Sequence, residues 1–372
     1  MSSPYILYNA SVARWNGLKS IWEISSLKSK ETNDFNNLNK NKDKIKSVTN
    51  DIEISTKSNS KELNIEKKSS SGSSEKSQKF KTTSSLLLND ESNKLNSDYV
   101  NNYIEKESFY FNSSYLKLSK LSILTYNVWF DNYNWDNRLK GILSILESKN
   151  ADVVCLQEVT DRFFRFLTDQ EFIKKTYKIT IIPSQMLCGY DVLILSKFEC
   201  NAYVSPFYSK MGRKLLYITI INNSNDLIKI GTVHLESLNN SNIRENQLKL
   251  SYDLLKSTEL ENKDFNCTHA FLLGDFNFTE KETHLINNNG FVDFGYEVVI
   301  KDNFNFSKWC TMKEMNGYPH WRPDRVTYLS SSKSFTVTHF EIVGKNKIEI
   351  LDKSNPVDTP SDHFGIYFEC SL

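Results

Sequence analysis

Seven polar residues in the second two-thirds of this chain stand at the ends of five short apolar runs. Four of the runs end in such residues, and the last run, 364–370, begins after them. The seven are Asn127, Glu158, His234, Asp275, Asn277, Asp362 and His363. Carboxylate, amide and imidazole groups, with no nucleophilic Ser or Cys among them, predict a phosphodiesterase site that uses a divalent metal ion.

Hydrolysis of a phosphodiester needs charge neutralisation on the phosphoryl oxygens, an activated water and help for the leaving oxygen. Glu158 offers a hard oxygen ligand of the kind that magnesium or manganese prefers. Asp275 can accept a proton from the attacking water or orient it. Asn127 can hold the metal ligand or the phosphate, and Asn277 can donate a hydrogen bond to a phosphoryl oxygen. These four residues therefore cover metal binding, water activation and phosphate binding.

The two histidines complete this set. His234 and His363 can each donate a hydrogen bond to the pentacovalent phosphate, and as cations they would oppose its charge. Asp324, in the stretch Arg322-Pro323-Asp324-Arg325, is a candidate to orient His363. The remaining histidines have no metal-ligand spacing to another His or Cys, which argues against a zinc site. Taken singly, each residue also has an ordinary structural explanation, such as a turn, a helix cap or a satisfied strand end.

The elements that must carry these residues follow from the hydrophobic pattern. Helices are expected at 136–149, 160–168 and 243–259. Strands are expected at 121–127, 151–157, 177–182, 191–196, 214–222, 228–235, 270–275, 324–329, 335–342 and 364–370. Hairpin-like strand order mixed with strand–helix–strand passages predicts an α/β fold. We expect a four-layered α/β sandwich, with two mostly antiparallel sheets flanked by helices.

Composition divides the chain into three segments. Residues 117–372 carry the apolar runs and form the expected catalytic domain, whereas residues 28–116 are a Ser/Lys/Asn-rich, low-complexity linker that we expect to be disordered. Residues 1–27 are a short segment of unknown role, in which Trp15, Leu18 and Trp22 share one helical face. That face is either a docking motif for a partner or part of a short element that packs onto the main domain.

Charge and cysteine content place few limits on function. The net charge of +1 and pI of about 7.5 give no basic field that would argue for nucleic acid, and they do not exclude it. The 6 cysteines are dispersed, without a C-x-x-C pair, which is typical of free thiols in a reducing compartment. No stretch approaches the roughly 18 apolar residues of a membrane span, and no signal peptide is evident. We expect a soluble, intracellular protein that does not act at a membrane.

The ordered motifs resemble those of the endonuclease/exonuclease/phosphatase superfamily, over about residues 120–371. Within it they are most similar to the tyrosyl-DNA phosphodiesterase 2 subfamily, with a first motif of plant type, Tyr126-Asn127-Val128-Trp129-Phe130. The other matching blocks are Cys155-Leu156-Gln157-Glu158-Val159-Thr160, His234-Leu235-Glu236-Ser237, Gly274-Asp275-Phe276-Asn277 and Pro360-Ser361-Asp362-His363-Phe364-Gly365.

The resemblance implies a magnesium-dependent enzyme, with manganese as the alternative ion. Its substrate would be a DNA 5′ end that carries a tyrosyl peptide adduct left by a trapped type II topoisomerase. Glu158 would bind the metal, Asp275 would position the water, and the catalytic Asn127, His234, Asn277 and His363 would surround the phosphate, with Asp324 behind His363. Arg244, Trp309 and Tyr190 are weaker candidates for DNA contacts, through charge and stacking. A role in the repair of DNA breaks implies a nuclear protein, with the cytoplasm as an alternative. We expect a monomer.

One position departs from the resemblance. Vertebrate-type members carry an Asp two residues after the first-motif Asn, and this chain has Trp129 there. A water, Asp362 or Asp131 would have to complete the metal shell, so Asp362 is the second metal-ligand candidate beside Glu158. Other functions remain open within the same fold: an abasic-site endonuclease, a sphingomyelinase, a deadenylase or a catalytically inactive binding module.

Overall fold

The computed structural model describes residues 8–16, 21–25, 117–182, 187–222, 226–258, 265–295, 321–350 and 357–372. Every described element belongs to one compact unit. The expected linker 28–116 lies outside the described residues, and so does Trp309. The division of the chain into three segments therefore stays a prediction.

The described strands form two sheets, which β1 joins into one continuous order. The first contains, in spatial order, β11 (Val292–Asp293), β12 (Asp324–Ser330), β10 (Asn266–Asp275), β9 (Asp226–His234), β8 (Lys214–Ile221) and β7 (Asn201–Pro206). The second contains β5 (Lys178–Ile181), β6 (Asp191–Ser196), β4 (Val153–Val159), β3 (Lys120–Asn127), β14 (Gly365–Ser371) and β13 (Thr336–Val343). Strand β1 (Tyr8–Asn16) pairs with both β7 and β5, and β2 (Ile21–Ser25) pairs with β1.

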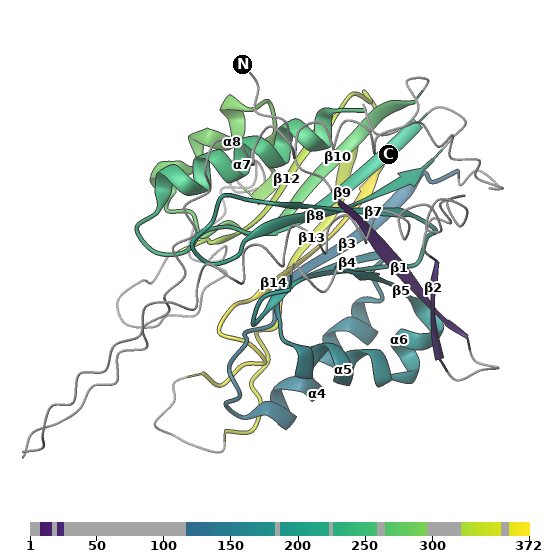
Figure 1. Ribbon diagram of the computed structural model, residues 1–372, viewed down its shortest axis with the longest axis vertical. Coiled ribbons are helices and arrows are strands. Elements are labelled where there is room, and N and C mark those ends of the chain that lie inside the picture. The colour runs from purple at the N-terminus through teal and green to yellow at the C-terminus, as the bar shows by residue number, and fades with distance from the viewer. Residues whose placement is uncertain are drawn as a thin grey trace, which may run out of the picture. The chain divides into compact units, whose positions relative to one another are not determined.

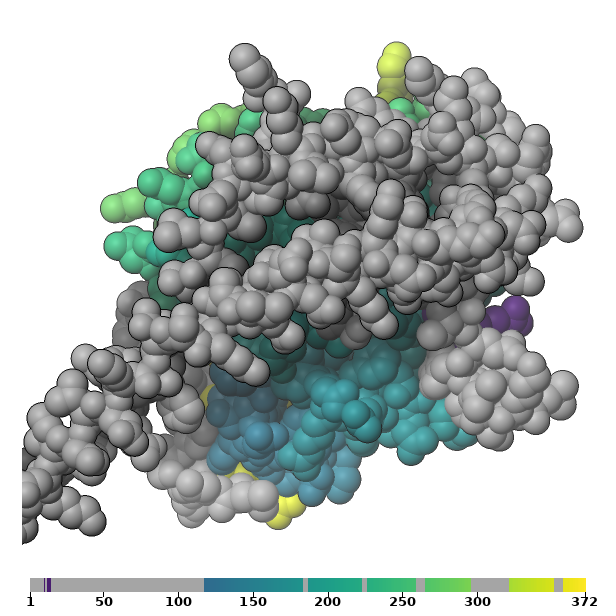
Figure 2. Space-filling view, viewed as in Figure 1, coloured from purple at the N-terminus to yellow at the C-terminus, as the bar shows by residue number. Residues whose placement is uncertain are grey.

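Apolar side chains fill three layers of core, one between the sheets and one on each outer face. Ile123, Ile194, Ile218 and Phe271 are among those that pack between the two sheets. The outer face of the second sheet is covered by α4 (Trp135–Lys149), α5 (Asp161–Asp169) and α6 (Glu171–Thr176), and that of the first by α7 (Ser241–Lys256) and α8 (His284–Asn288) (Figure 1). Figure 2 shows blue and teal atoms of the α4–α6 side exposed at the lower part of the view. The expected four-layered sandwich is confirmed.

Burial on both faces explains why the central strands read as continuous apolar runs. Each of the seven residues of β4 is buried, as are the last five of β3. The helices instead show one buried stripe, with Leu139, Ile142 and Leu146 facing the sheet from α4. The sequence pattern therefore distinguishes the two kinds of element by how many of their faces are covered.

Two strand pairs are parallel, and each is joined by a helix. Strands β3 and β4 are connected through α4, and β9 and β10 through α7, while the other strand pairs of the described residues are antiparallel. Parallel strands bring their carboxyl ends to one edge of a sheet. Each sheet thus offers one such edge, and the polar residues of the sequence motifs stand on these edges.

The N-terminal segment is not the helix that the spacing of its tryptophans predicts. Residues 8–16 and 21–25 form an antiparallel strand pair, not a helix. Ala10 and Val12 are buried in the core between the sheets, which is the two-residue period of a strand. In so short a segment, the helical and the strand period cannot be told apart by spacing alone.

The described ranges contain no candidate membrane span and no disulfide. No helix among the described ranges is long and apolar enough to cross a bilayer. The cysteines of those ranges are unpaired, with Cys155 and Cys370 buried and Cys188 exposed.

Candidate active site

The candidate residues meet at one rim, where the two sheets face each other. Asn127 and Glu158 lie at the carboxyl end of the parallel pair in one sheet, and His234 and Asp275 lie at the same end of the pair in the other. Antiparallel neighbours bring their starts to this rim. Asp324 opens β12 opposite Asp275, and His363 stands just before β14, which is antiparallel to β3.

Asn127 holds the two sheets together at the centre of the site. Its fully buried amide Nδ2 donates to Glu158 Oε1 at 3.2 Å and to Asp275 Oδ2 at 3.1 Å. Its Oδ1 accepts from the backbone N–H of Trp129 at 3.0 Å. One side chain therefore fixes the spacing of the carboxylates from two sheets.

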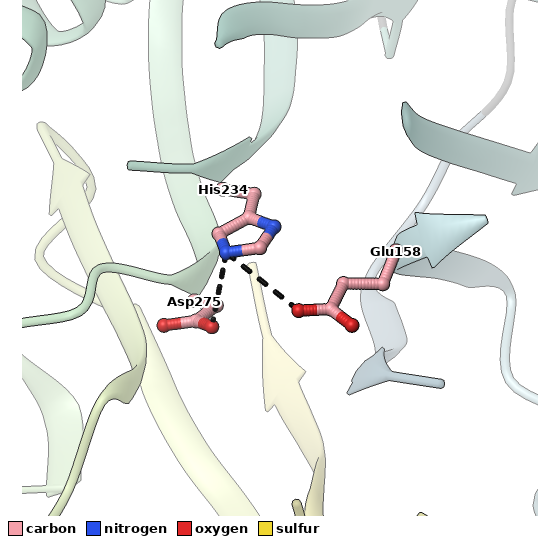
Figure 3. Close-up of side chains that lie close together, drawn as sticks. All are labelled: Glu158, His234 and Asp275. Carbon is pink, nitrogen blue, oxygen red and sulfur yellow. Dashed lines mark ion pairs between the residues drawn. The ribbon is translucent and has the colours of Figure 1, made fainter. Parts of the chain in front are cut away.

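His234 lies between these two carboxylates (Figure 3). Its Nε2 is 3.4 Å from Asp275 Oδ2 and 3.9 Å from Glu158 Oε1. The three side chains offer ligand atoms that lie within 4.8 Å of one another, and all three residues are buried. A phosphate or metal ion bound here would therefore be removed from bulk water.

Unusual backbone geometry aims these side chains. Glu158 and Asn277 adopt positive φ angles of 61° and 52°, in the left-handed region that non-glycine residues seldom occupy. Gly274 has φ 128°, and a Cβ there would meet the carbonyl oxygen of Val233 at 2.1 Å. The glycine before Asp275 is thus required by close strand packing, whereas the sequence had suggested an ordinary turn or helix cap as the alternative.

Hydrogen bonds tie the first and last motifs to this centre. Ser361 Oγ donates to the backbone oxygen of Asn127 at 2.7 Å and accepts from the backbone N–H of His363 at 3.1 Å. Asn277 donates its backbone N–H to Asp275 Oδ1 at 2.8 Å and its amide to Leu235 O at 3.2 Å. Asn277 therefore supports Asp275 directly and stands beside the space where a phosphate would bind.

The charge of His234 differs from the sequence expectation. Arg213 Nη1 lies 2.9 Å from His234 Nδ1. Because a guanidinium has no acceptor, Nδ1 must accept and the ring carries its proton on Nε2. Burial, followed by the Arg213 and His363 charges, lowers the pKa of His234 well below its ordinary value. This shift favours a neutral ring that donates through Nε2 over the cation considered from the sequence.

His363 behaves in the opposite way. Its Nδ1 lies 2.8 Å from Asp324 Oδ2, and its Nε2 is 3.9 Å from Asp275 Oδ2. Burial by itself would lower the pKa of His363, but the attraction of Asp324, Asp362 and Asp275 outweighs it and raises that pKa well above the ordinary value. The site therefore holds one neutral and one cationic imidazole, and Asp324 contacts His363 as the sequence suggested.

The carboxylates fit a hard divalent cation. Desolvation raises the pKa of Glu158, and it raises the pKa of Asp275 to about 7. Crowded, dehydrated carboxylates are the donor set that magnesium or manganese neutralises. Since the Nε2 of neutral His234 carries a proton, oxygen atoms and not imidazole would hold the ion.

Asp362 and Asp131, the other two candidates for the metal shell, differ in their surroundings. Asp362 is buried beside Ser361, whose Oγ lies 3.3 Å from its Oδ1. No cluster close enough to share one ion includes Asp362 in the described part of the chain. Asp131 is exposed and accepts from the backbone of Tyr133. The geometry supports Glu158 as a metal ligand, and the roles of Asp362 and Asp131 stay predictions.

Trp129, in place of the expected carboxylate, is held by Arg138 of α4. It has φ 57°, and the Arg138 guanidinium carbon lies 4.5 Å from its ring centroid. Arg138 also donates to the backbone oxygens of Val128 and Trp129, each at 2.7 Å. The next residue, Phe130, donates its N–H to Glu158 Oε2 at 2.9 Å. The first-motif loop thus orients Glu158 through a backbone donor.

Aromatic rings stack beside the site. Tyr190 stacks on Phe130, with centroids 4.9 Å apart and planes at 10°, and on His234, at 5.9 Å and 28°. The Arg213 guanidinium lies 5.3 Å from the Tyr190 centroid. Phe130 is 45% exposed, so the outer end of the stack is open to solvent. Tyr190 therefore lies at the site, and Phe130 offers the open aromatic face.

Arg244, the other described DNA-binding candidate, is buried inside the protein. Its guanidinium pairs with Glu282 at 2.8 and 3.0 Å and donates to the backbone oxygens of Glu236 and Leu238. This arrangement argues against direct contact with DNA. Arg244 instead fixes the loop that follows His234.

Sequence reasoning missed Arg213 and Phe130. Arg213 stands one residue before β8, with no motif around it, and it reaches His234 only through the fold. Phe130 was noted as part of a motif, but nothing in its spacing indicates a stack on Tyr190. Both contacts join segments far apart in the sequence.

Comparisons with known proteins agree with this geometry. The model of the endonuclease/exonuclease/phosphatase family matches residues 124–363. Tyrosyl-DNA phosphodiesterase 2 of Mus musculus is 26% identical over 268 residues, covering 68% of this chain and 66% of its own length. The 5′-tyrosyl-DNA phosphodiesterase of Caenorhabditis briggsae is 24% identical over 261 residues, covering 68% of this chain and 69% of its own. The crystal structure of D. rerio TDP2 with a single-strand DNA product has a TM-score of 0.54 and 25% identity, and the match covers 68% of this chain and all of that one.

Proposed function

This chain belongs to the endonuclease/exonuclease/phosphatase family, and we propose that it is a magnesium-dependent phosphodiesterase that cleaves the bond between a tyrosine and a 5′ DNA phosphate. The observation that carries the proposal is the convergence of Asn127, Glu158, His234, Asp275 and His363 at one buried rim. The likeness to tyrosyl-DNA phosphodiesterases supports the substrate. The adducts would be peptides of trapped type II topoisomerase, repaired by a nuclear monomer.

The donors of the site fit a phosphoryl group in the transition state. The Nε2–H of neutral His234 and of cationic His363 both face Asp275. A phosphate between them would accept from two imidazoles, and the single positive charge would oppose the charge that develops on its oxygens. Asn127 and Asn277 keep the carboxylates in place, so the donors need not reorganise during the reaction.

Asp275 is the candidate base. Its pKa of about 7 lies near neutral pH, where a base is both largely deprotonated and able to accept a proton. The reaction adds a water oxygen to phosphorus, releases the tyrosine phenolate and leaves a 5′-phosphate, with the water proton passing to Asp275. A magnesium ion held by Glu158 would supply positive charge to the phosphoryl and leaving oxygens.

The direct test is cleavage of a 5′-phosphotyrosyl oligonucleotide by the purified chain with magnesium. We expect release of tyrosine and a 5′-phosphorylated strand. The same oligonucleotide with a 3′-phosphotyrosine serves as the control for polarity. Cleavage of an abasic duplex, sphingomyelin or poly(A) with the phosphotyrosyl strand left intact would replace this proposal by another enzyme of the fold. Binding without cleavage of any of them would indicate an inactive module.

Magnesium binding should be visible without catalysis. In wild type, magnesium is expected to raise the Tm, by an amount that corresponds to about 2.7 kcal/mol at a hundred times the Kd. In Glu158→Gln this shift should disappear, because the variant lacks a carboxylate that the ion neutralises. Differential scanning fluorimetry over a magnesium titration, with EDTA as the reference, measures both shifts.

A matched surface variant controls for the substitution itself. Glu341→Gln removes a carboxylate on β13, where Glu341 pairs with Lys149 and is half-exposed, and it should keep the full magnesium response. An equal response in all three proteins would mean that Glu158 does not hold the ion.

A further inference from the structure

Strand β1 belongs to both sheets. Its first part, Tyr8 to Ala10, pairs with β7, and the next part, Ser11 to Ala13, pairs with β5. In Figure 1 it is the purple strand that runs beside both. Without it, β5 and β7 would each be the free edge of a sheet in the described fold. One edge of each sheet is therefore covered by a segment that the family match at 124–363 does not include.

The pairing places β1 at the base of two loops of the site. Both pairings are antiparallel, with Tyr8 opposite Val204 and Ser11 opposite Ile181. The start of β1 thus lies beside the carboxyl ends of β5 and β7. The connection after β5 leads to Tyr190, and the loop after β7 leads to Arg213.

Tyr190 and Arg213, near the ends of these two connections, meet at His234. Arg213 donates to its Nδ1 at 2.9 Å, and Tyr190 stacks on its ring. The loops are also joined where the next strands begin, since Lys214 Nζ lies 2.6 Å from Asp191 in a buried ion pair. The two loops and His234 line one small pocket. Movement of either loop would therefore change the hydrogen bond that sets the tautomer of His234.

Buried side chains anchor β1 to the strands that precede the two loops. Val12 is 7% exposed and Ala13 is 2% exposed, and Ala10 and Val12 pack in the core between the sheets. Backbone pairing at a sheet edge suppresses the local opening to which edges are prone. A segment of 91 residues (26–116) separates β2 from the described start of the catalytic part. The β1–β2 pair therefore joins sheets whose other strands lie far from it in the sequence.

We propose that the N-terminal strand β1 is a positioning element of the active site, which fixes the loops that carry Tyr190 and Arg213 against His234. It acts through these residues and does not touch the substrate. The activity measurements of this inference rest on the proposed function, whereas its exchange measurements do not. The alternative is that β1 only adds to the stability of the whole fold.

The test uses full-length protein with the pairing of β1 broken. Val12→Pro removes the backbone N–H of the residue that pairs with Thr180 of β5 and with Ser25 of β2. We expect amide hydrogen exchange in residues 187–190 and 207–213 to rise by about tenfold, and in residues 270–277 to stay unchanged. The kcat per folded molecule should fall by about 10- to 100-fold, because the donors around the phosphate are displaced.

Two more variants keep the test decisive. Val337→Pro breaks the pairing of the opposite edge strand, β13, at its end away from the rim, and should lower the Tm without affecting the two loops. Ala13→Gly is milder and retains the backbone N–H, so it reports on β1 if Val12→Pro does not fold. It should raise exchange in the same two loops by a smaller factor.

The outcomes separate the two explanations. If Val12→Pro and Ala13→Gly lower the Tm as Val337→Pro does, with loop exchange and kcat per folded molecule unchanged, β1 only stabilises the fold. If wild type cleaves no phosphotyrosyl substrate, the proposed function fails, and the exchange pattern still decides whether β1 holds the loops.

Discussion

Replacing Asp275 with asparagine is expected to lower kcat on a 5′-phosphotyrosyl oligonucleotide by about a thousandfold or more. The amide cannot accept the proton of the attacking water. It also places an NH2 group where Asp275 Oδ2 now accepts from Asn127 Nδ2 at 3.1 Å and lies 3.4 Å from His234 Nε2. The loss should fall on kcat more than on KM, because the interaction is made in the transition state.

The same variant should remain folded. Burial raises the pKa of Asp275 to about 7, so the folded chain holds this proton more tightly than the unfolded chain does. The stability linked to that proton is complete below the ordinary pKa of the carboxyl group and is lost as the pH rises through about 7. At pH 8 without metal, wild type carries a buried charge that Asp275→Asn lacks. The Tm of the variant relative to wild type should therefore increase from pH 6 to pH 8.

Kinetics and thermal melts on the same preparations check both halves of this prediction. Asp253→Asn, on the outer side of α7 where Asp253 pairs with Lys249, is the matched control and should leave kcat unchanged. Near-normal activity of Asp275→Asn would remove Asp275 from the mechanism. If Asp275→Asn does not fold, a second variant tests the catalytic role of Asp275. Asp275→Glu keeps the carboxylate and should retain part of the activity.

The strand and helix positions could largely be read from the sequence. Strand β6 was predicted at its observed bounds, and the largest difference among the predicted elements is four residues, at the start of β10, expected at 270 and observed at Asn266. Strands such as β4 are buried on both faces, so an uninterrupted apolar run marks them clearly. The site residues were predictable for the same reason, because each ends or begins such a run.

Weakly patterned elements were missed. Strand β7, Asn201–Pro206, mixes polar residues with a proline, and α6 has only 6 residues. Strand β1 was obscured by a chance helical spacing of tryptophans. In these segments tertiary pairing determines the structure, and no local period records it.

The charges of the site could not be predicted from residue types. His234 and His363 look alike in the sequence, and both stand next to apolar runs. Burial, followed by the Arg213 charge beside Nδ1, lowers the pKa of His234, whereas the attraction of Asp324 outweighs burial and raises the pKa of His363. The partner of each ring is set by the sheet topology, so its protonation state appears only in the folded chain.

This contrast between the two imidazoles leads to the second large effect. His363→Gln is expected to lower kcat by about 10²- to 10³-fold at every pH, because the site loses its only cationic imidazole as well as a donor. Asp324→Asn should act differently, since it leaves the ring and removes the carboxylate 2.8 Å from its Nδ1. Its effect should depend on pH.

The sign of that dependence follows from the pKa of His363. The attraction of Asp324 opposes the lowering caused by burial, and the net pKa lies well above the ordinary value. The cation, and the activity that needs it, is therefore present below that pKa and is lost as the pH rises through it. In Asp324→Asn burial is less opposed, so the pKa falls and the alkaline limb of the pH–rate profile moves to lower pH.

Profiles of kcat against pH for wild type, Asp324→Asn and His363→Gln separate the donor from the charge. At a pH below the shifted limb, Asp324→Asn should recover most of the wild-type rate, whereas His363→Gln should not recover at any pH. At pH 8, Asp324→Asn should be about 10- to 100-fold slower than wild type. A uniform loss in Asp324→Asn without a shifted limb would mean that Asp324 only orients the ring. Since wild-type His234 is already neutral, a shifted limb in that variant reports on His363, and the developing phosphoryl charge is then opposed by the imidazole that Asp324 keeps protonated.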